Sequence, residues 1–540
     1  MLRGMAVLRP FTGMRARPSL RSASRLLHRG AALTVLLGAL GGGVFGCSLS
    51  SISKTDCQTD DECSKAFGLG SACQAGYCSE GLSCTTGHDC RKKLGGGVCV
   101  SGLCSATIPT DDACKTLFDP EDLFTTKAGP GAPLIIGAIF STEESKNEAI
   151  TKAVRLAVRE IDRSGALTDG QKIAIVVCDN GGPMNAAAGD ERIPLNNHAI
   201  DYLSGTLGAP VVVGPLTSSD SIRLINRIKE KAYPTVLISP SATSPQLTAI
   251  DDRLSPNDTG LFWRTAPSDL LQGKVLADNV VDQAAAKVAV TYIQDAYGEG
   301  LATVFQTTFG SEKVKLHPYT DADLKDPAKL DALATAIDAD APNAVVVIAL
   351  HGATLIQLLT PMATKNVGKN GTPFYFTDGA KDATALLAAD VPAGVQTILA
   401  GAQGTAPASP SGSNYELFKT NLFTEFKLDA SSFAFLAQAY DATYVGAYGI
   451  ILAAKNGPDY DGIQVAAGLT HLSKGKLTNV APTTWQTAKG ELIDVGQLNV
   501  EGTSGHLDFD PKTGEAPAPI EVWGLSADKK SFKTIKTIDP

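Results

Sequence analysis

An alternation of short apolar runs and helical stretches constrains the fold of this 540-residue chain more than any other feature. Each run has the length of a buried strand, and a stretch with helical spacing follows it. This order is typical of parallel sheets with right-handed crossovers. Roughly 400 residues are too many for one such sheet, so we expect two lobes. The expected strands are 134–140, 172–178, 211–214, 235–239, 287–292, 344–350 and 374–377, and the expected helices are 147–164, 198–205, 218–232, 300–309 and 354–365.

Residues 1–46 have the pattern of a cleaved export signal. They contain seven Arg and no Lys, Asp or Glu, and an apolar run ends at Gly46. That run is shorter than the roughly 20 residues of a membrane-spanning helix. It ends in Val44-Phe-Gly-Cys47, which resembles a bacterial lipobox, so we expect lipid on Cys47. An ordinary secretory signal with Cys47 incidental is the alternative.

A lipid on Cys47 would hold the exported chain at a membrane. Ser48 follows the cysteine and favours the outer over the inner membrane by the sorting rule of Gram-negative lipoproteins. Residues 47–56 are then a short tether. The expected location is periplasm-facing or at the cell surface.

Eight of the ten remaining cysteines form a tandem repeat in residues 57–104. Units this small cannot bury enough apolar surface, so disulfides are expected to stabilise them. The duplication predicts bonds within each unit but leaves the pairing open. Metal binding is the alternative, although the spacing lacks the Cys-x2-Cys of zinc sites. The first unit contains Cys57, Cys63, Cys73 and Cys78, and the second contains Cys84, Cys90, Cys99 and Cys104.

Two cysteines lie outside the repeat. A bond between Cys114 and Cys178 would attach the expected linker, residues 105–130, to the main domain. A buried free thiol at Cys178 is the alternative. His88, beside the repeat cysteines, is expected to be a solvated loop residue.

Charge and motif content exclude several function classes. Beyond the leader the chain has 40 basic and 56 acidic residues, a balance that repels the phosphates of nucleic acids. The sequence has no Gly-x-Ser-x-Gly, His-Glu-x-x-His, P-loop or dinucleotide fingerprint. We therefore expect a binding protein, with no enzyme activity, no cofactor and no metal.

Three loops that follow expected strands carry the polar groups of a binding site. They are residues 213–220, 238–247 and 292–301, which are rich in hydroxyls or combine an aromatic with glycines. In doubly wound sheets, ligands bind at the carboxyl ends of strands. Hydroxyls and free amides at a helix start suit a carboxylate, although a helix cap alone would use one hydroxyl.

These loops resemble those of the leucine/isoleucine/valine-binding proteins, which have the type I periplasmic-binding fold. The matching motifs are Ser239-Pro-Ser-Ala-Thr-Ser-Pro-Gln-Leu247 and Tyr297-Gly-Glu-Gly300. Residues 263–268 resemble the first hinge crossing, and 505–510 with 520–523 resemble the closing hairpin. The likeness covers about residues 131–540. It implies two doubly wound sheets, with lobe I at about 131–265 and 406–488 and lobe II at about 266–405 and 489–540.

The resemblance also implies roles for individual residues. Ser218 and Thr243 would bind a ligand carboxylate, assisted by the backbone near Ser241. Tyr297 would cover the ligand from lobe II. Asp378 would receive an α-ammonium, the alternative being a turn aspartate before glycine.

His351 stands about where the family has an aromatic residue, and a hydrogen-bonded loop histidine is the alternative. The implied function is capture of an amino-acid-like or amide ligand for an ABC-type importer, with a permease as partner. The second hypothesis is a membrane-anchored sensor or scaffold that regulates a protein partner.

The lipobox generates the first prediction. Replacing Cys47 with Ala removes the only acceptor for the lipid, so the protein should move from the membrane fraction to the soluble fraction. Fractionation of cells and immunoblotting measure this, with Ser48→Ala as a control that stays with the membranes. A Cys47→Ala protein that still sediments with membranes would show that the lipobox interpretation is wrong.

Overall fold

The computed structural model describes residues 57–119, 128–129, 131–141, 145–181, 192–282, 285–368, 371–408 and 412–540. The expected signal, Cys47, the tether 47–56 and part of the expected linker lie outside the described residues. Among the helices described, none combines the length and the apolar character needed to cross a bilayer.

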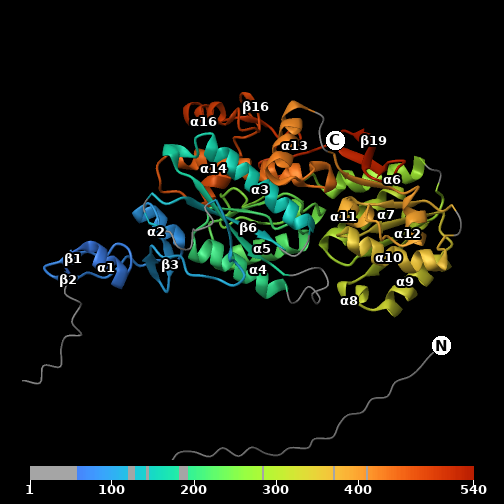
Figure 1. Cartoon of the computed structure of the whole chain (residues 1–540), viewed down its shortest axis with the longest axis horizontal. Helices are drawn as coiled ribbons and strands as arrows, with labels where there is room; N and C mark the ends of the chain where they lie inside the picture. Colours follow the sequence, from blue (N-terminus) through green and yellow to red (C-terminus); the bar gives the residue numbers. More distant parts are fainter. Residues whose placement is uncertain are drawn as a thin grey trace, which may run out of the picture. The chain divides into compact units, whose positions relative to one another are not determined.

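Lobe I is a six-stranded sheet with helices on both faces (Figure 1). Its strand order is β10-β9-β8-β6-β7-β5, parallel except for the edge strand β5. Helices α3 and α14 lie on one face, and α4 and α5 lie on the other. The strands are β5 (Thr116–Phe118), β6 (Leu134–Phe140), β7 (Ile173–Asp179), β8 (Val211–Val213), β9 (Val236–Ser239) and β10 (Phe262–Arg264). The helices are α3 (Ser145–Arg163), α4 (Arg192–Ile200), α5 (Ser218–Lys231), α13 (Ser413–Phe426), α14 (Leu436–Ala454), α15 (Gly462–Leu469) and α16 (Trp485–Asp494).

Lobe II is a seven-stranded sheet in the order β12-β11-β13-β14-β15-β18-β19. The first five strands are parallel and the last two pair antiparallel. The strands are β11 (Val288–Ile293), β12 (Val314–Tyr319), β13 (Ala344–Ile348), β14 (Phe374–Phe376), β15 (Gln403–Pro407), β18 (Ile520–Leu525) and β19 (Phe532–Ile538). The helices are α6 (Asp269–Asp282), α7 (Ala296–Phe309), α8 (Asp321–Leu324), α9 (Pro327–Ala339), α10 (Gly352–Lys365), α11 (Ala383–Leu386) and α12 (Ala393–Leu399).

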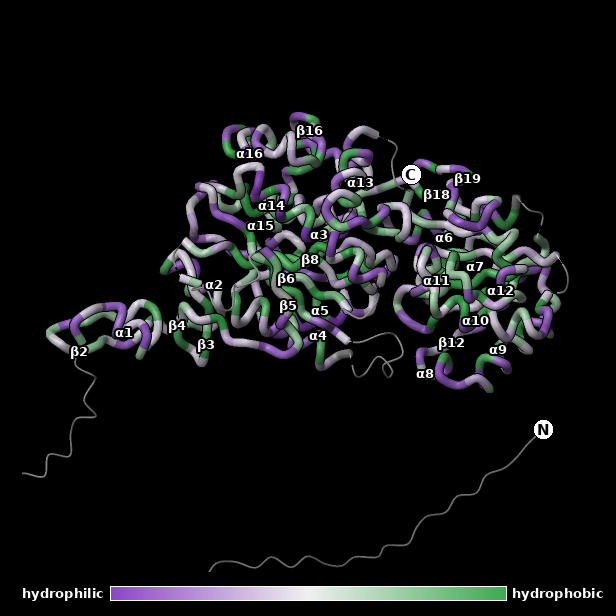
Figure 2. Tube along the Cα trace, in the orientation of Figure 1, coloured by the Kyte–Doolittle hydropathy of each residue, from purple (hydrophilic) through white to green (hydrophobic). Residues whose placement is uncertain are grey.

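Each lobe has its own hydrophobic core, built mainly from the central strands. All seven residues of β6 and all five of β13 are buried, as expected for strands covered on both faces. Figure 2 shows hydrophobic colour along these sheets and hydrophilic colour over much of the outer surface. The fold class and the positions of the expected strands are confirmed.

Two expected boundaries are wrong. Leu492, Val500 and Phe509 pack in the core of lobe I, so the chain enters lobe II for the last time near residue 517 and not at 489. The segment between holds β17 (Asn499–Glu501), which pairs with β16 (Leu477–Asn479) on lobe I. The expected linker 105–130 is also partly structured, because β5 pairs antiparallel with β7. The strands in these segments are short and contain few apolar residues. Their sequences therefore show no periodicity from which a lobe could be predicted.

Both units of the cysteine repeat have the same structure, a helix followed by a hairpin. In the first unit α1 (Asp60–Phe67) precedes β1 (Cys73–Gln74) and β2 (Tyr77–Cys78), and in the second α2 (Gly87–Leu94) precedes β3 (Val98–Val100) and β4 (Leu103–Ser105). Each unit joins its first cysteine to its third and its second to its fourth. The bonds are Cys57–Cys73, Cys63–Cys78, Cys84–Cys99 and Cys90–Cys104, and Cys114 is bonded to Cys178.

The second unit packs directly on lobe I. Arg91 donates to the carbonyls of Gly208 and Tyr460, and its guanidinium lies over the Tyr460 ring. Gly87 has no room for a side chain, since a Cβ there would lie 2.5 Å from the backbone nitrogen of Gly208. His88 is 2% exposed and lies 3.4 Å from the Thr235 hydroxyl, so its expected solvation is wrong. Burial, with Arg91 and Lys92 nearby, holds the pKa of His88 well below its usual value.

The repeat generates the second prediction. Peptide mapping under non-reducing conditions should recover first-to-third and second-to-fourth pairs in both units, because one pair ties a residue before the helix to the hairpin and the other ties the helix itself to it. Reduced and alkylated protein is the control and should release every peptide singly. A peptide that links the first unit to the second would contradict the modular arrangement.

Candidate functional site

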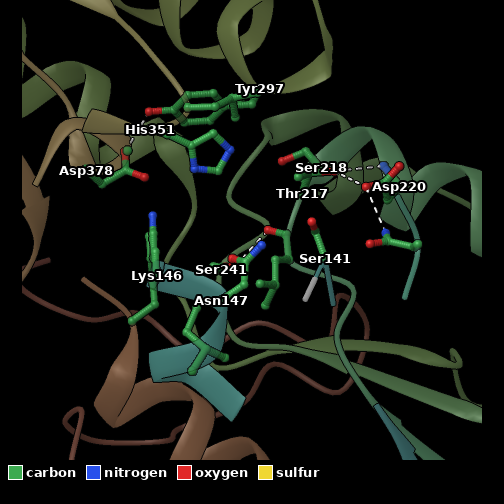
Figure 3. A pocket seen from close by; sticks show the side chains of 16 residues that line it. Ser141, Lys146, Asn147, Thr217, Ser218, Asp220, Ser241, Tyr297, His351 and Asp378 are labelled. Carbon is green, nitrogen blue, oxygen red and sulfur yellow. Dashed lines mark hydrogen bonds between the residues drawn. The ribbon is translucent and has the colours of Figure 1, made fainter. Parts of the chain in front are cut away.

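A pocket lined by residues of both lobes lies at the carboxyl ends of the parallel strands (Figure 3). Lobe I contributes loops that follow β6, β7, β8 and β9, together with the first turns of α3 and α5. Lobe II contributes the start of α7 and the loops after β13 and β14. This is the position at which doubly wound sheets bind ligands.

Five of the six expected ligand-binding residues line this pocket. They are Ser218, Ser241, Tyr297, His351 and Asp378. The sixth, Thr243, does not line it. Its buried hydroxyl donates to Asp269 Oδ2 at 2.8 Å, beneath the loop, so the expectation that Thr243 faces the ligand is wrong.

The loop from β8 to α5 forms the lobe I wall of the pocket. Thr217 caps α5, accepting from the Asp220 amide at 3.2 Å. Ser218 Oγ accepts from the Ser244 amide at 3.1 Å, which leaves its own proton for a ligand oxygen. The Ser241 hydroxyl donates to the Leu216 carbonyl at 2.8 Å, and the Ser241 amide donates to Ser239 Oγ. Both groups of Ser241 therefore already make hydrogen bonds within the loop.

Asp220, in the first turn of α5, is a pocket residue that the sequence did not single out. Its carboxylate accepts from Asn180, Asn196 and Thr217, and it pairs with Arg223 at 2.8 Å. Arg223 therefore neutralises the charge of Asp220, which would otherwise repel a ligand carboxylate at the start of the helix.

Two buried polar atoms of the pocket wall have no hydrogen-bond partner among the described residues. They are Ser141 Oγ, just after β6, and Asn180 Oδ1, just after β7. Leaving a buried polar atom unpaired costs about 1–3 kcal/mol. Such atoms in a pocket wall are suited to a polar ligand.

The lobe II side carries a hydrogen-bonded acid. Asp378 Oδ1 accepts from Gln272 at 2.5 Å and from the Tyr297 hydroxyl at 2.8 Å, and Tyr297 also contacts Thr377 Oγ1 at 2.8 Å. Burial raises the pKa of Asp378, and the charge of Lys146 acts in the opposite direction. Burial and the neighbouring Asp378 raise the pKa of Asp269 well above its usual value.

Lys146 and Phe435 complete the wall from lobe I, and the sequence indicated neither. Lys146 is 8% exposed, and its ammonium lies 5.1 Å from the centroid of the Phe435 ring. Phe435 adopts a φ of 73°, a left-handed conformation that bulky residues rarely take. His351 precedes α10 and lies partly buried on the lobe II rim.

A buried arginine at the first crossing positions the loop after β9. Arg264 donates to the carbonyls of Ala242 and Ser244 at 3.0 Å each, and to Thr248. It also pairs with Glu515 of the last crossing at 2.5 Å. One side chain thereby connects two crossings to the loop that ends beside Ser218.

The fold and this site define a two-lobed binding protein with a polar pocket between its lobes. Residues 149–528 match the family model described as the receptor family ligand binding region. The chain therefore belongs to that family, and its ligand-binding region has the leucine-binding-protein type of fold.

Known relatives agree with this assignment. The chain is 27% identical over 175 residues to Leu/Ile/Val-binding protein homolog 3 of Brucella melitensis, covering 32% of this chain and 42% of that protein. It therefore spans about two fifths of the length of that relative. The chemotactic signal transduction system substrate-binding protein BasB of Halobacterium salinarum is 25% identical over 406 residues, covering 72% of this chain and 83% of that protein.

Solved structures show the same fold. The branched-chain amino acid transporter substrate binding protein LivJ from Streptococcus pneumoniae, in complex with isoleucine, superimposes with a TM-score of 0.54 at 19% identity. It covers 76% of this chain and all of that one. A solute binding protein of an ABC transporter from R. palustris, in complex with benzoate, gives a TM-score of 0.55 at 16% identity, covering 76% of this chain and 97% of that one.

The crossing arginine generates the third prediction. Arg264→Met should destabilise the protein by about 3–5 kcal/mol, because it leaves Glu515 and several carbonyls without their buried partner. Thermal unfolding followed by circular dichroism measures the loss. The control is Arg253→Met, whose half-exposed pair with Asp251 contributes about 1 kcal/mol or less. Equal midpoints for the two variants would contradict the role given to Arg264.

Proposed function

We propose that this protein is an extracytoplasmic solute-binding lipoprotein that captures a small amino-acid-like or amide solute between two closing lobes. The observation that carries the proposal is the pair of unpartnered buried atoms, Ser141 Oγ and Asn180 Oδ1, in a pocket shared by both lobes. Membership of the ligand-binding-region family supports it.

The pocket chemistry suggests how such a solute is oriented. A carboxylate fits the start of α5, where the Ser218 hydroxyl accepts from the Ser244 amide and could donate its proton to the ligand, and where the helix end favours negative charge. The polar head of the solute then faces Asp378, Tyr297 and His351 of lobe II. Apolar side chains of Ile150, Leu216 and Leu350 would contact its hydrocarbon part.

Delivery to an ABC-type importer is the biological role we propose. The ten cysteines bonded in pairs fit an oxidising compartment outside the cytoplasm. A lipid on Cys47 would hold the chain at a membrane, with the outer membrane favoured, and a permease would be the protein partner.

A sensor or scaffold role is the second candidate. BasB, a relative aligned over most of this chain, is named as part of a chemotactic signal transduction system. The first cysteine unit adds support. Its core contains only residues of the same unit, so its outer surface could bind a protein partner. Cross-linking in intact cells separates the two roles: an importer yields permease subunits as partners, and a sensor yields a signalling protein.

Ser141 generates the fourth prediction. A thermal-shift screen of amino acids, amides and short-chain acids first identifies a solute that raises the unfolding midpoint. Ser141→Ala should then weaken the binding of that solute about tenfold, because the variant loses one hydrogen bond worth about 1–1.5 kcal/mol. The midpoint of the protein without solute should not fall, because the wild-type hydroxyl has no described partner.

Calorimetry on the purified variant measures the affinity. Thr364→Ala, at an exposed position of α10 where the hydroxyl bonds only within the helix, is the control. Unchanged affinity in Ser141→Ala, or a screen in which no solute shifts the midpoint, would contradict the proposed capture.

A further inference from the structure

Lys146 places a positive charge of lobe I where the pocket meets the acid of lobe II. It lies in the first turn of α3, is 8% exposed, and points its ammonium towards the Asp378 carboxylate (Figure 3). The Phe435 ring, 5.1 Å away, flanks this ammonium, and Phe435 takes its uncommon backbone conformation beside it. The lysine is therefore a built part of the pocket wall.

The two acids that line the pocket, Asp220 and Asp378, and Asp269 behind its wall have compensating partners in the chain. Asp220 pairs with Arg223. Asp269 is buried behind the wall, accepts from Thr243, and lies within electrostatic reach of Arg264. Asp378 has Gln272, Tyr297 and the nearby charge of Lys146. No uncompensated negative charge of a described residue is left in the pocket to attract a ligand ammonium.

A ligand ammonium would meet an unfavourable environment in either protonation state of Asp378. If Asp378 is ionised, Lys146 already neutralises it and would repel a second cation beside it. If Asp378 keeps its proton, as its burial favours, it offers no charge to the ammonium. An amide or hydroxy head group fits both states, because its acceptor can face Lys146 and its donor can face Asp378. An oxo group, which only accepts, fits both states by accepting from Lys146.

We infer that the solute is a carboxylic acid without an α-ammonium, bound by its carboxylate at the start of α5 and by a neutral amide, oxo or hydroxy group between Lys146 and Asp378. This inference rests on the proposed function and narrows its ligand class. Lys146 takes the place that the family resemblance gave to the ammonium of an amino acid. Asp378 then orients Lys146 and accepts the donor of an amide or hydroxy head group, whereas an oxo group accepts from Lys146.

Matched ligand pairs test the inference. The exported Cys47→Ala chain is titrated by calorimetry with leucine and 4-methyl-2-oxopentanoate, and with phenylalanine, N-acetylphenylalanine and 3-phenyl-2-oxopropanoate. Within each set only the α-substituent changes. The wild-type pocket should bind the member without an ammonium at least about tenfold more tightly.

Lys146→Met removes the charge and keeps an unbranched side chain of similar length. This variant should lose affinity for the acids by about tenfold or more and gain affinity for the amino acids, which reverses the preference. Lys152→Met is the matched control on the same helix. Its ammonium pairs with Glu148, outside the pocket lining, so it should leave both affinities unchanged.

The outcomes separate this inference from the proposed function. Tighter binding of the free amino acids by the wild-type pocket overturns the inference and leaves solute capture intact, as does amino-acid affinity that falls in a folded Lys146→Met protein. Binding of no member of any set overturns both. If Lys146→Met does not fold, the wild-type preference alone decides the inference, and Lys146→Gln gives the reversal test.

Discussion

The buried guanidinium of Arg264 is the interaction on which the site depends. A fully buried cation is tolerated only when its donors find acceptors, and here these come from two separate segments: the connection between β9 and β10, which includes Thr248, and Glu515. The same side chain holds two crossings side by side and fixes the carbonyls of Ala242 and Ser244. The Ser244 amide in turn donates to Ser218, so the position of Ser218 at the start of α5 depends on the segment that Arg264 holds.

The pocket shows how two similar sheets produce an asymmetric site. Both lobes present the carboxyl ends of parallel strands, and these ends differ in chemistry. Lobe I supplies hydroxyls, a helix start and Lys146, whereas lobe II supplies Tyr297, His351 and Asp378. The opposite charges of Lys146 and Asp378 attract across the boundary before any solute is considered. The charge that selects the solute therefore also favours approach of the lobes.

The sequence predicted those parts of the fold that bury complete segments. Strands such as β6 and β13 are apolar throughout, so their composition and length identified them. The family resemblance assigned ligand contacts to Ser218, Tyr297 and Asp378, which line the pocket, and also to Thr243, whose hydroxyl points the other way. A loop pattern does not state which face a side chain takes.

Other site residues had no such signal. Lys146 begins an amphipathic helix, where a lysine is ordinarily solvated, and Ser141 and Asn180 are single polar residues at strand ends. Their role depends on segments far away in the chain, as with Phe435, which lies 289 positions after Lys146 and flanks its ammonium. The burial of His88 likewise depends on Gly208 leaving space for Gly87, a contact between residues 121 positions apart.

The docking of the second cysteine unit on lobe I divides the molecule mechanically. Arg91 and Gly87 place that unit against lobe I, and the chain passes between lobe I and lobe II at the crossings. The closure proposed above would therefore move lobe II relative to lobe I and the second cysteine unit. A partner that binds only the second unit or lobe I would bind the protein equally well whether or not its pocket is filled. A partner that responds to that proposed closure would have to contact lobe II.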